Sequence, residues 1–314
     1  MSNTEETKKS VWKKDVMKEL IPELRERLLK SKIVLSEEQE QRIAEQLHKV
    51  VTYRARIGFF GKTGSGKSSL CNSLFGEDVA SISDIAACTR APQEYLLQLA
   101  ETRDIVLVDV PGVGESLKRD EEYFALYKRL TPQLDAILWI IKADDRAFTV
   151  DEKCWKELVQ PYIDDDAPVV VVINQVDKFN PLNDWDYGSS APGPQQLRLI
   201  QEKVVEVSRA FGVSQDRVIP VSAMQGFNIP HLVETVILSL PKQKKIAVLK
   251  DIPESKRTQK AKEDAERGFF DAAKEIVINA LESTGRVVVE VWESVKPHIG
   301  PLLLEALKIW ARRK

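Results

Sequence analysis

The stretch from residue 61 to residue 68 constrains this chain more than any other part of it. It reads Gly-Lys-Thr-Gly-Ser-Gly-Lys-Ser and matches the phosphate-binding pattern G-x-x-x-x-G-K-[ST]. The apolar run 57–60 before it predicts a buried strand, and residues 69–75 after it have helical spacing that ends at Gly76. A strand, a glycine-rich loop and a helix in this order indicate a loop that binds nucleotide phosphates.

The residue types in this loop suit phosphate chemistry. Glycines let successive backbone N–H groups turn toward phosphate oxygens, and the N-terminus of the following helix adds a partial positive charge. We expect Lys67 to reach the outer phosphates and the Ser68 hydroxyl to bind Mg²⁺. The loop residues expected to bind the nucleotide are Gly61, Lys62, Thr63, Gly64, Ser65, Gly66, Lys67, Ser68 and Ser69.

Alternating strand and helix patterns follow the loop. Strands are predicted at residues 57–61, 95–99, 105–109, 136–141, 169–174 and 218–222, and helices at residues 67–75, 121–130, 151–162, 195–211 and 229–239. This alternation predicts an α/β fold with a mostly parallel six-stranded sheet and helices on both of its faces. In such sheets the ligand binds at the carboxyl ends of the strands.

Helical segments flank this alternating region on both sides. Ser36 followed by Gln39 predicts a capping box that opens a helix before the phosphate loop. After Pro241 a basic, polar stretch runs to residue 267, and residues 270–295 then present the apolar face of a long helix. We therefore divide the chain into an N-terminal helical segment (1–53), a nucleotide-binding domain (54–240) and a C-terminal helical segment (241–314), and the two helical segments are candidates to pack together.

The composition of the chain excludes some classes of protein but does not indicate a function. Hydrophobic residues make up 43% and charged residues 30% of the 314, and the net charge of −2 gives no strong signal for nucleic-acid binding. Cys71, Cys88 and Cys154 lack metal-ligand spacing and indicate a reducing compartment. No apolar run approaches the length of a membrane span, so we expect a cytoplasmic protein.

One strand end and one connecting residue are candidates for the Mg²⁺ and phosphate end of the site. Asp109 ends the strand 105–109 and can hold Mg²⁺ through water, and the N–H of Gly112 can contact the terminal phosphate. Thr89 lies between the helix of the phosphate loop and the next strand, where it can close over the metal. An ordinary surface threonine is the alternative interpretation of Thr89.

Two further strand ends bear on the identity of the base. In the segment Asn174-Gln175-Val176-Asp177, the carboxylate of Asp177 can accept two hydrogen bonds from guanine, whereas adenine presents a mismatched edge. Ser222 and Ala223 follow the last strand, and their backbone can approach the guanine oxygen. Together these segments predict a site for a guanine nucleotide.

In this order, the segments resemble the Era-like GTPases of the translation-factor-related class, a group of bacterial ribosome-binding and prophage-type GTPases. The phosphate loop is also similar to that of septin/AIG1 and immunity-related GTPases. The resemblance covers residues 54–240 and implies hydrolysis of GTP to GDP and phosphate with Mg²⁺. It implies nucleotide binding by Asn174, Gln175, Asp177, Ser222 and Ala223 beside the phosphate loop, metal binding by Ser68, Thr89 and Asp109, and catalytic roles for Lys67, Thr89 and Gly112.

Three positions depart from the pattern of this family. Gln175 replaces a lysine, which should leave guanine selectivity to Asp177 and lower the affinity. Val113 stands where Ras-like enzymes have a glutamine that orients water, and Gly64 stands where some relatives have an asparagine that holds K⁺. We therefore expect slow intrinsic hydrolysis, with the attacking water held by backbone groups, by a residue of a partner or by a cation. Lys62 and Arg90 could stabilise charge on the leaving phosphates, but we interpret both as solvated surface charges.

Three functions remain open from the sequence. The first is a GTP-hydrolysing switch with a protein partner. The second is a membrane-associated, dynamin-like or immunity-type GTPase that self-assembles through its helical segments, since Trp292, Trp310 and the basic end 312–314 suit a membrane interface. An ordinary helical core is the alternative for those aromatic residues. The third is a nucleotide-binding structural module with little turnover.

Overall fold

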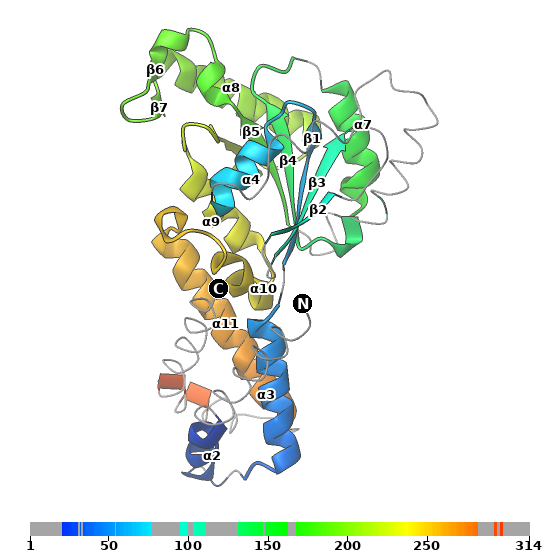
Figure 1. Ribbon diagram of the computed structural model, residues 1–314, viewed down its shortest axis with the longest axis vertical. Coiled ribbons are helices and arrows are strands. Elements are labelled where there is room, and N and C mark those ends of the chain that lie inside the picture. Colours follow the sequence, from blue (N-terminus) through cyan, green and yellow to red (C-terminus); the bar gives the residue numbers. More distant parts are fainter. Residues whose placement is uncertain are drawn as a thin grey trace. The chain divides into compact units, whose positions relative to one another are not determined.

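The computed structural model of the chain contains an α/β unit and a helical unit (Figure 1). It describes residues 21–30, 32, 34–53, 55–76, 95–99, 103–110, 128, 131–146, 148–162, 168–281, 292–293 and 296–297. Contacts within the chain group residues 54–241 and 251–264 into one unit, here called the sheet unit, and the remaining residues into a second, here called the helical unit. The segment 251–264 thus groups with the sheet, although the sequence placed it in the C-terminal helical segment.

The sheet unit is built on six strands in the order β2-β3-β1-β4-β5-β8. β2 runs antiparallel to β3, and all other neighbours are parallel. This arrangement confirms the predicted mostly parallel six-stranded sheet, with the last strand shorter than expected. The strands are β1 Arg56–Lys62, β2 Tyr95–Leu99, β3 Arg103–Val110, β4 Ala136–Lys142, β5 Val169–Asn174 and β8 Val218–Pro220.

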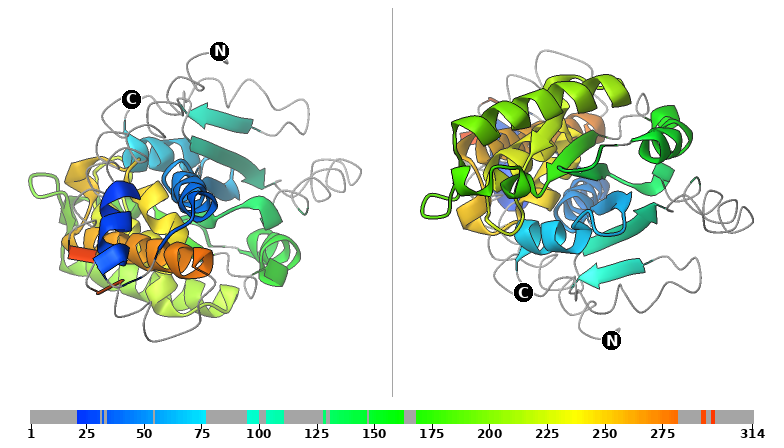
Figure 2. Two further views of the ribbon diagram at one scale, coloured as in Figure 1. Left: turned by 90° about the horizontal axis from the view of Figure 1, so that it is seen from below. Right: turned by 90° about the horizontal axis from the view of Figure 1, so that it is seen from above.

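Helices cover both faces of the sheet because its central strands are apolar on both sides. Phe60 of β1 stacks on Trp139 of β4 at 5.9 Å between ring centroids, and Trp139 meets Trp155 of a helix edge to face at 5.6 Å. Phe59 points to the opposite face and meets Phe75 of another helix at 6.4 Å. Figure 2 shows helices on either side of the strands.

The helices of the sheet unit match the predicted ranges closely. Helix α4 contacts α9, and α7 contacts α8, so each face of the sheet carries one such pair. The predicted helix 151–162 is divided into α7 and a short 3₁₀ helix, and the predicted helix 121–130 lies outside the described residues except for Lys128. The bounds are α4 Lys67–Phe75, α7 Thr149–Leu158, α8 Pro194–Phe211 and α9 Ile229–Ser239.

The register of the sheet brings the predicted site segments to one edge. Gly61 at the end of β1 lies opposite Asp109 of β3. Asn174 at the end of β5 lies opposite Lys142 of β4. Since these strands are parallel, the phosphate loop and the base segment begin at the same edge.

Polar contacts hold the segment 251–264 to helices α4 and α9 of the sheet unit. The Thr258 hydroxyl donates to Glu234 of α9 at 2.6 Å, and Lys260 forms an ion pair with the same carboxylate at 3.1 Å. The ammonium group of Lys256 donates to the carbonyl of Ser73 in α4. These long-range contacts explain why a polar stretch that follows Pro241 groups with the sheet.

The helical unit combines residues from both ends of the chain. The capping box is confirmed, because Ser36 Oγ accepts from the Gln39 N–H at 3.2 Å and Gln39 Oε1 accepts from the Ser36 N–H at 2.9 Å. Helix α3 contacts α10, and Trp292 is buried at 3% exposure. A buried Trp292 belongs to a helical core, the alternative interpretation given above for this residue. The helices are α2 Ile21–Lys30, α3 Glu37–Val51, α10 Lys242–Leu249 and the part of α11 (Gln259–Ala280) from residue 265 on.

The polar stretch 242–267 is more helical than its composition suggested. It contains all of α10 and the beginning of α11. Ile246, Ala247, Val248 and Leu249 of α10 are buried. Within the described residues, we find no helix with the length and apolar character needed to cross a bilayer.

Candidate nucleotide-binding site

The phosphate loop joins β1 to α4 and depends on glycine at its narrowest points. Gly66 has φ +89°, and a Cβ atom there would lie 2.4 Å from Nδ2 of Asn174. A Cβ atom on Gly61 would lie 2.4 Å from the carbonyl oxygen of Ile140. The loop can therefore lie against β4 and the base segment only because these two positions lack side chains.

Lys67 is held inside the loop by backbone oxygens. Its side chain is buried, and Nζ donates to the carbonyls of Gly61 at 2.9 Å and Lys62 at 3.0 Å. The Ser65 N–H donates to the Lys62 carbonyl at 3.1 Å, which closes the turn. Ser68 and Ser69 follow in the first turn of α4 and are half-buried. This arrangement places an ammonium group and the helix N-terminus at the same loop, as anion binding requires.

Asn174 ties three segments of the site together. Its side chain is 1% exposed, and Nδ2 donates to the Ser65 carbonyl at 3.0 Å. Oδ1 accepts from the N–H of Gln175 at 2.8 Å and from the N–H of Ala223 at 3.1 Å. The phosphate loop, the base segment and the segment after β8 are thus joined through one buried amide.

Gln175 makes a second contact between the base segment and the phosphate loop. Its backbone is left-handed at φ +66°, and Nε2 donates to the Gly64 carbonyl at 2.9 Å. Lys178 donates from Nζ to Gln175 Oε1 at 2.7 Å. The glutamine that replaces the lysine of the family pattern therefore still bonds to the phosphate loop.

Asp177 and Ser222 occupy the two sides expected to meet the base. Asp177 is half-buried, and no hydrogen bond to its carboxylate occurs within the described residues. Ser222 is buried, and its hydroxyl accepts from the Gln225 N–H at 3.2 Å, which shapes the turn that carries Ala223. The Asp177 carboxylate is thus available as an acceptor, while Ser222 is used structurally.

Sequence reasoning missed Gln196 of α8. It is fully buried, and Nε2 donates to the Phe179 carbonyl at 2.7 Å. The carboxylate of Asp184 accepts from the N–H groups of Gln195 at 2.9 Å and Gln196 at 2.8 Å and caps α8. Gln196 thereby supports the segment that follows Asp177. The available signal was a polar residue within the buried face of an amphipathic helix.

The interpretation of Lys62 as a solvated surface charge is wrong. Its Nζ lies 2.5 Å from Oδ2 of Asp151 and 4.0 Å from Oδ2 of Asp145. Asp151 is buried in the first turn of α7, and burial raises the pKa of its carboxyl although Lys62 beside it acts in the opposite direction. The second residue of the phosphate loop is therefore anchored to α7.

The metal end of the site is described in part. The β3 backbone carries Asp109 beside Gly61, and Ser68 stands at the start of α4. An aspartate and hydroxyls form an all-oxygen donor set, which suits Mg²⁺. Thr89, Arg90, Gly112 and Val113 lie outside the described residues, so their roles remain predictions. Within the described part, no cluster of three or more His, Cys, Asp or Glu residues could hold a metal.

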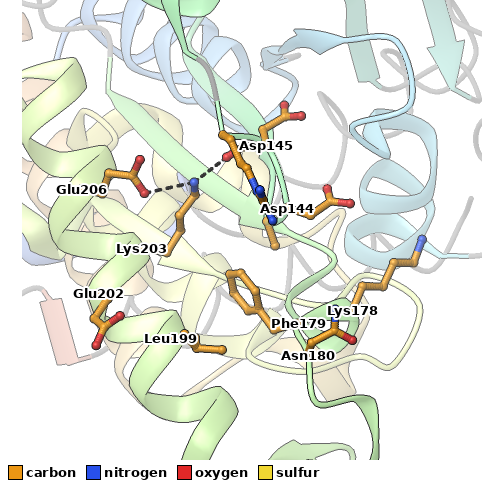
Figure 3. A pocket seen from close by; sticks show the side chains of 11 residues that line it. Asp144, Asp145, Lys178, Phe179, Asn180, Leu199, Glu202, Lys203 and Glu206 are labelled. Carbon is orange, nitrogen blue, oxygen red and sulfur yellow. Dashed lines mark hydrogen bonds and ion pairs between the residues drawn. The ribbon is translucent and has the colours of Figure 1, made fainter.

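A pocket of about 550 Å³ opens next to the base segment (Figure 3). It is lined by residues 143–146 after β4, residues 178–180 and α8. Lys203 of α8 donates to the Asp145 carbonyl at 2.5 Å, pairs with Glu206 at 3.1 Å and lies over the Phe148 ring at 4.3 Å. Lys203 thus fixes the connection between β4 and α7, which carries Asp145 and leads into the first turn of α7 with Asp151.

Comparisons with known proteins agree with this geometry. A family model described as 50S ribosome-binding GTPase matches residues 56–175. The uncharacterised protein YkfA of Escherichia coli (strain K12) is 39% identical over 229 residues, which cover 73% of this chain and 77% of that protein. GTPase Era of Aquifex aeolicus (strain VF5) is 28% identical over 188 residues, 59% of this chain and 56% of that protein.

A crystal structure of Aquifex aeolicus Era bound to GDP·AlF4⁻ matches 59% of this chain and 56% of that chain, with 26% identity and a TM-score of 0.40. The residues matched by the family model include the phosphate loop and the beginning of the base segment. The chain belongs with YkfA to the Era-like, ribosome-binding type of GTPases, and residues 56–175 are its match to the 50S ribosome-binding GTPase model.

Proposed function

We propose that this GTPase is a slow nucleotide-dependent switch that binds Mg²⁺ and GTP in the site described above. The observation that carries the proposal is the Asn174 side chain, which bonds to Ser65 and Ala223 at once. A nucleotide held between these segments contacts the phosphate loop at one end and Asp177 at the other. Occupancy of the site therefore bears on three segments that are far apart in the sequence.

The described residues supply binding and positioning. Lys67 and the N-terminus of α4 offer positive charge to the phosphates, and Asp177 offers the acceptor that distinguishes guanine from adenine. Ser68, Asp109 and Thr89 are the proposed ligands of Mg²⁺, which when bound neutralises charge on the phosphates. The N–H of Gly112 is the proposed contact to the terminal phosphate.

Slow turnover follows from the residues that the chain lacks at two positions. Val113 cannot form a hydrogen bond to water, and Gly64 has no side chain to bind K⁺. Lys62 does not substitute for them, since its ammonium group is paired with Asp151. We therefore propose that a protein partner supplies the missing catalytic group.

Base selection is tested by Asp177→Asn, with Asp216→Asn as a matched control at an exposed aspartate of the same unit. The first variant should bind GTP more weakly and xanthosine triphosphate more tightly, since an amide matches the altered base edge. The control should leave both affinities unchanged. An unchanged base preference in Asp177→Asn would contradict the assignment of the base segment.

Turnover is tested by single-turnover phosphate release with enzyme in excess over GTP, with and without K⁺. The expected result is slow release that K⁺ does not accelerate. Fast release without a partner would contradict the proposed catalytic deficiency. If no phosphate is released at any enzyme concentration, the chain is a nucleotide-binding structural module instead.

Membrane association is the second candidate, and its basic residues at 312–314 are the feature that keeps it open. Flotation with anionic liposomes, with and without a GTP analogue, separates it from a switch with a protein partner. A switch of the proposed kind should remain in the liposome-free fraction of the gradient in both conditions. Retention on liposomes that depends on the nucleotide would favour the self-assembling membrane GTPase.

A further inference from the structure

The side-chain amide of Gln175 lies between two groups with opposite hydrogen-bonding character. On one side the Gly64 carbonyl, which can only accept, receives a hydrogen bond from Nε2 at 2.9 Å. On the other side the Lys178 ammonium group, which can only donate, contacts Oε1 at 2.7 Å. A primary amide has one donating and one accepting end, so it satisfies both neighbours in one orientation only.

The reversed orientation of this amide is unfavourable on both sides. It would place Oε1 against the Gly64 carbonyl and the NH₂ group against the Lys178 ammonium group. Without Lys178, the Gly64 carbonyl would be the remaining described partner that selects between the two orientations. Lys178 therefore determines how often the amide points its donor at the phosphate loop.

Local backbone structure explains how Lys178 reaches Gln175. Gln175 precedes a 3₁₀ helix, Val176–Lys178, and the Lys178 N–H donates to the Gln175 carbonyl at 3.0 Å. In 3₁₀ geometry the side chains of residues three apart lie one above the other. The left-handed backbone at Gln175 and this turn together place the lysine over the amide.

Two consecutive side chains thus bond to two consecutive carbonyls of the phosphate loop. Asn174 bonds to Ser65, and Gln175 bonds to Gly64. The Asn174 amide is buried, and two backbone N–H groups fix its orientation. Both bonds of the Gln175 amide are exposed, and a flexible side chain fixes its orientation, so this second contact is the adjustable one.

We propose that Lys178 is a positioning residue of the nucleotide site, which acts through Gln175 to tie the base segment to Gly64. The proposal rests on the guanine site proposed above. Lys178 lines the pocket of Figure 3 on the side away from α8, and its side chain is exposed. Substitutions there remove a surface side chain and do not open a cavity in the core.

The dissociation rate of a fluorescent GDP analogue measures this effect directly. Lys178→Met should accelerate dissociation about two- to fivefold, the range expected for an exposed hydrogen bond to a charged group. Lys178→Glu should accelerate it further, since a carboxylate attracts the NH₂ end of Gln175 and favours the reversed amide. Lys178→Arg keeps a donor and should remain close to the wild-type rate.

Loss of a positive charge could by itself weaken the binding of an anionic ligand, and two controls separate that effect. Lys156→Met and Lys156→Glu make the same charge changes at an exposed lysine of α7 and should leave the rate unchanged. In a Gln175→Ala background, Lys178→Met should have no further effect, because the amide through which it acts is gone. Thermal unfolding of each variant checks that its fold is intact.

The outcomes distinguish this inference from the proposed function. If the wild type binds no GDP analogue, the proposed guanine site fails. If the wild type binds it and Lys178→Met dissociates at the wild-type rate, the positioning role alone is overturned. The positioning role is also overturned if Lys178→Met accelerates dissociation equally in the wild-type and Gln175→Ala backgrounds, because Lys178 would then act through its charge. Non-additivity together with rescue by Lys178→Arg would support the proposal.

Discussion

Replacing Asn174 with alanine tests whether one buried amide holds the site together. The change removes hydrogen bonds to the Ser65 carbonyl at 3.0 Å, the Gln175 N–H at 2.8 Å and the Ala223 N–H at 3.1 Å. No other side chain among the described residues is shown to join these three segments. The variant should therefore lose folding stability and nucleotide affinity together.

The expected loss of stability follows from the burial of each bond. The bond to Ser65 is buried, so an unpaired carbonyl remains, at a cost of about 1–3 kcal/mol. The two N–H groups are partly buried and accessible to water, so each of those bonds contributes about 0.5–1 kcal/mol. The total is about 2–5 kcal/mol, a substantial share of the roughly 5–15 kcal/mol that stabilises a typical domain.

Urea unfolding followed by tryptophan fluorescence measures this loss. Trp139 and Trp155 are buried in the core of the sheet unit and report on its unfolding. Asn228→Gly is the matched control, since it removes one asparagine bond, to the Pro220 carbonyl at 2.9 Å, and glycine retains the left-handed backbone at φ +60°. The control should cost about 1 kcal/mol.

The two variants are compared by the unfolding free energy that each loses relative to the wild type. If Asn174→Ala costs no more than Asn228→Gly, the three bonds at Asn174 do not act as described. Dissociation of a GDP analogue should also accelerate at least about tenfold in Asn174→Ala, which corresponds to roughly 1.4 kcal/mol of lost binding. If Asn174→Ala is less stable but releases the GDP analogue at the wild-type rate, Asn174 stabilises the fold and does not contribute to nucleotide binding.

Four further substitutions have defined outcomes. Burial raises the pKa of Asp151, so the folded state binds the proton more tightly than the unfolded state does. The stability of the wild type relative to Asp151→Asn should therefore rise as pH falls through this raised pKa, as measured by urea unfolding at several pH values, and a relative stability that falls on acidification would contradict this. The hydrogen bond from Thr258, aided by Lys260, lowers the pKa of Glu234. Glu234→Gln should therefore lower the folding stability by about 1 kcal/mol at neutral pH. This loss should become smaller as pH falls through the lowered pKa, and urea unfolding at several pH values measures it. Ser36→Ala removes the capping box and should cost about 1 kcal/mol in the helical unit, seen as a lower melting temperature by circular dichroism, whereas Ser36→Asp should retain most of the stability. Gly66→Ala forces a left-handed residue into 2.4 Å contact with Asn174 and should abolish retention of a GDP analogue, while Gly212→Ala, equally left-handed but with open space around it, should bind normally.

The sequence was sufficient for the parts of the fold that depend on local pattern. The alternation of strands and helices predicted a mostly parallel six-stranded sheet, and the structure contains it. The capping box at Ser36 was equally local and is confirmed. Helix α10 was not predicted, because Lys242–Leu249 reads as basic and polar and owes its helical state to burial of its last four residues.

Contacts between distant residues could not be read from the sequence. The motifs placed Asn174 and Ser65 in one site, but which carbonyl the amide binds depends on the register of β1, β4 and β5. Lys62 was misinterpreted because its partner Asp151 lies on a helix whose position is set by the core beneath it. Gln196 was missed because a buried glutamine has no sequence signature apart from its place on an apolar helix face.

Position 175 shows how a departure from a family pattern can be compensated nearby. The family has a lysine at this position, and its replacement by glutamine suggested only a loss of affinity. In the structure the positive charge lies three residues further on, at Lys178, and reaches the phosphate loop through the Gln175 amide. An amide transmits a hydrogen bond only in one orientation, whereas a lysine bonds to a carbonyl directly. The consequence is that the orientation of the side chain that bonds to Gly64 depends on a second side chain, so this contact is more easily broken than a direct one.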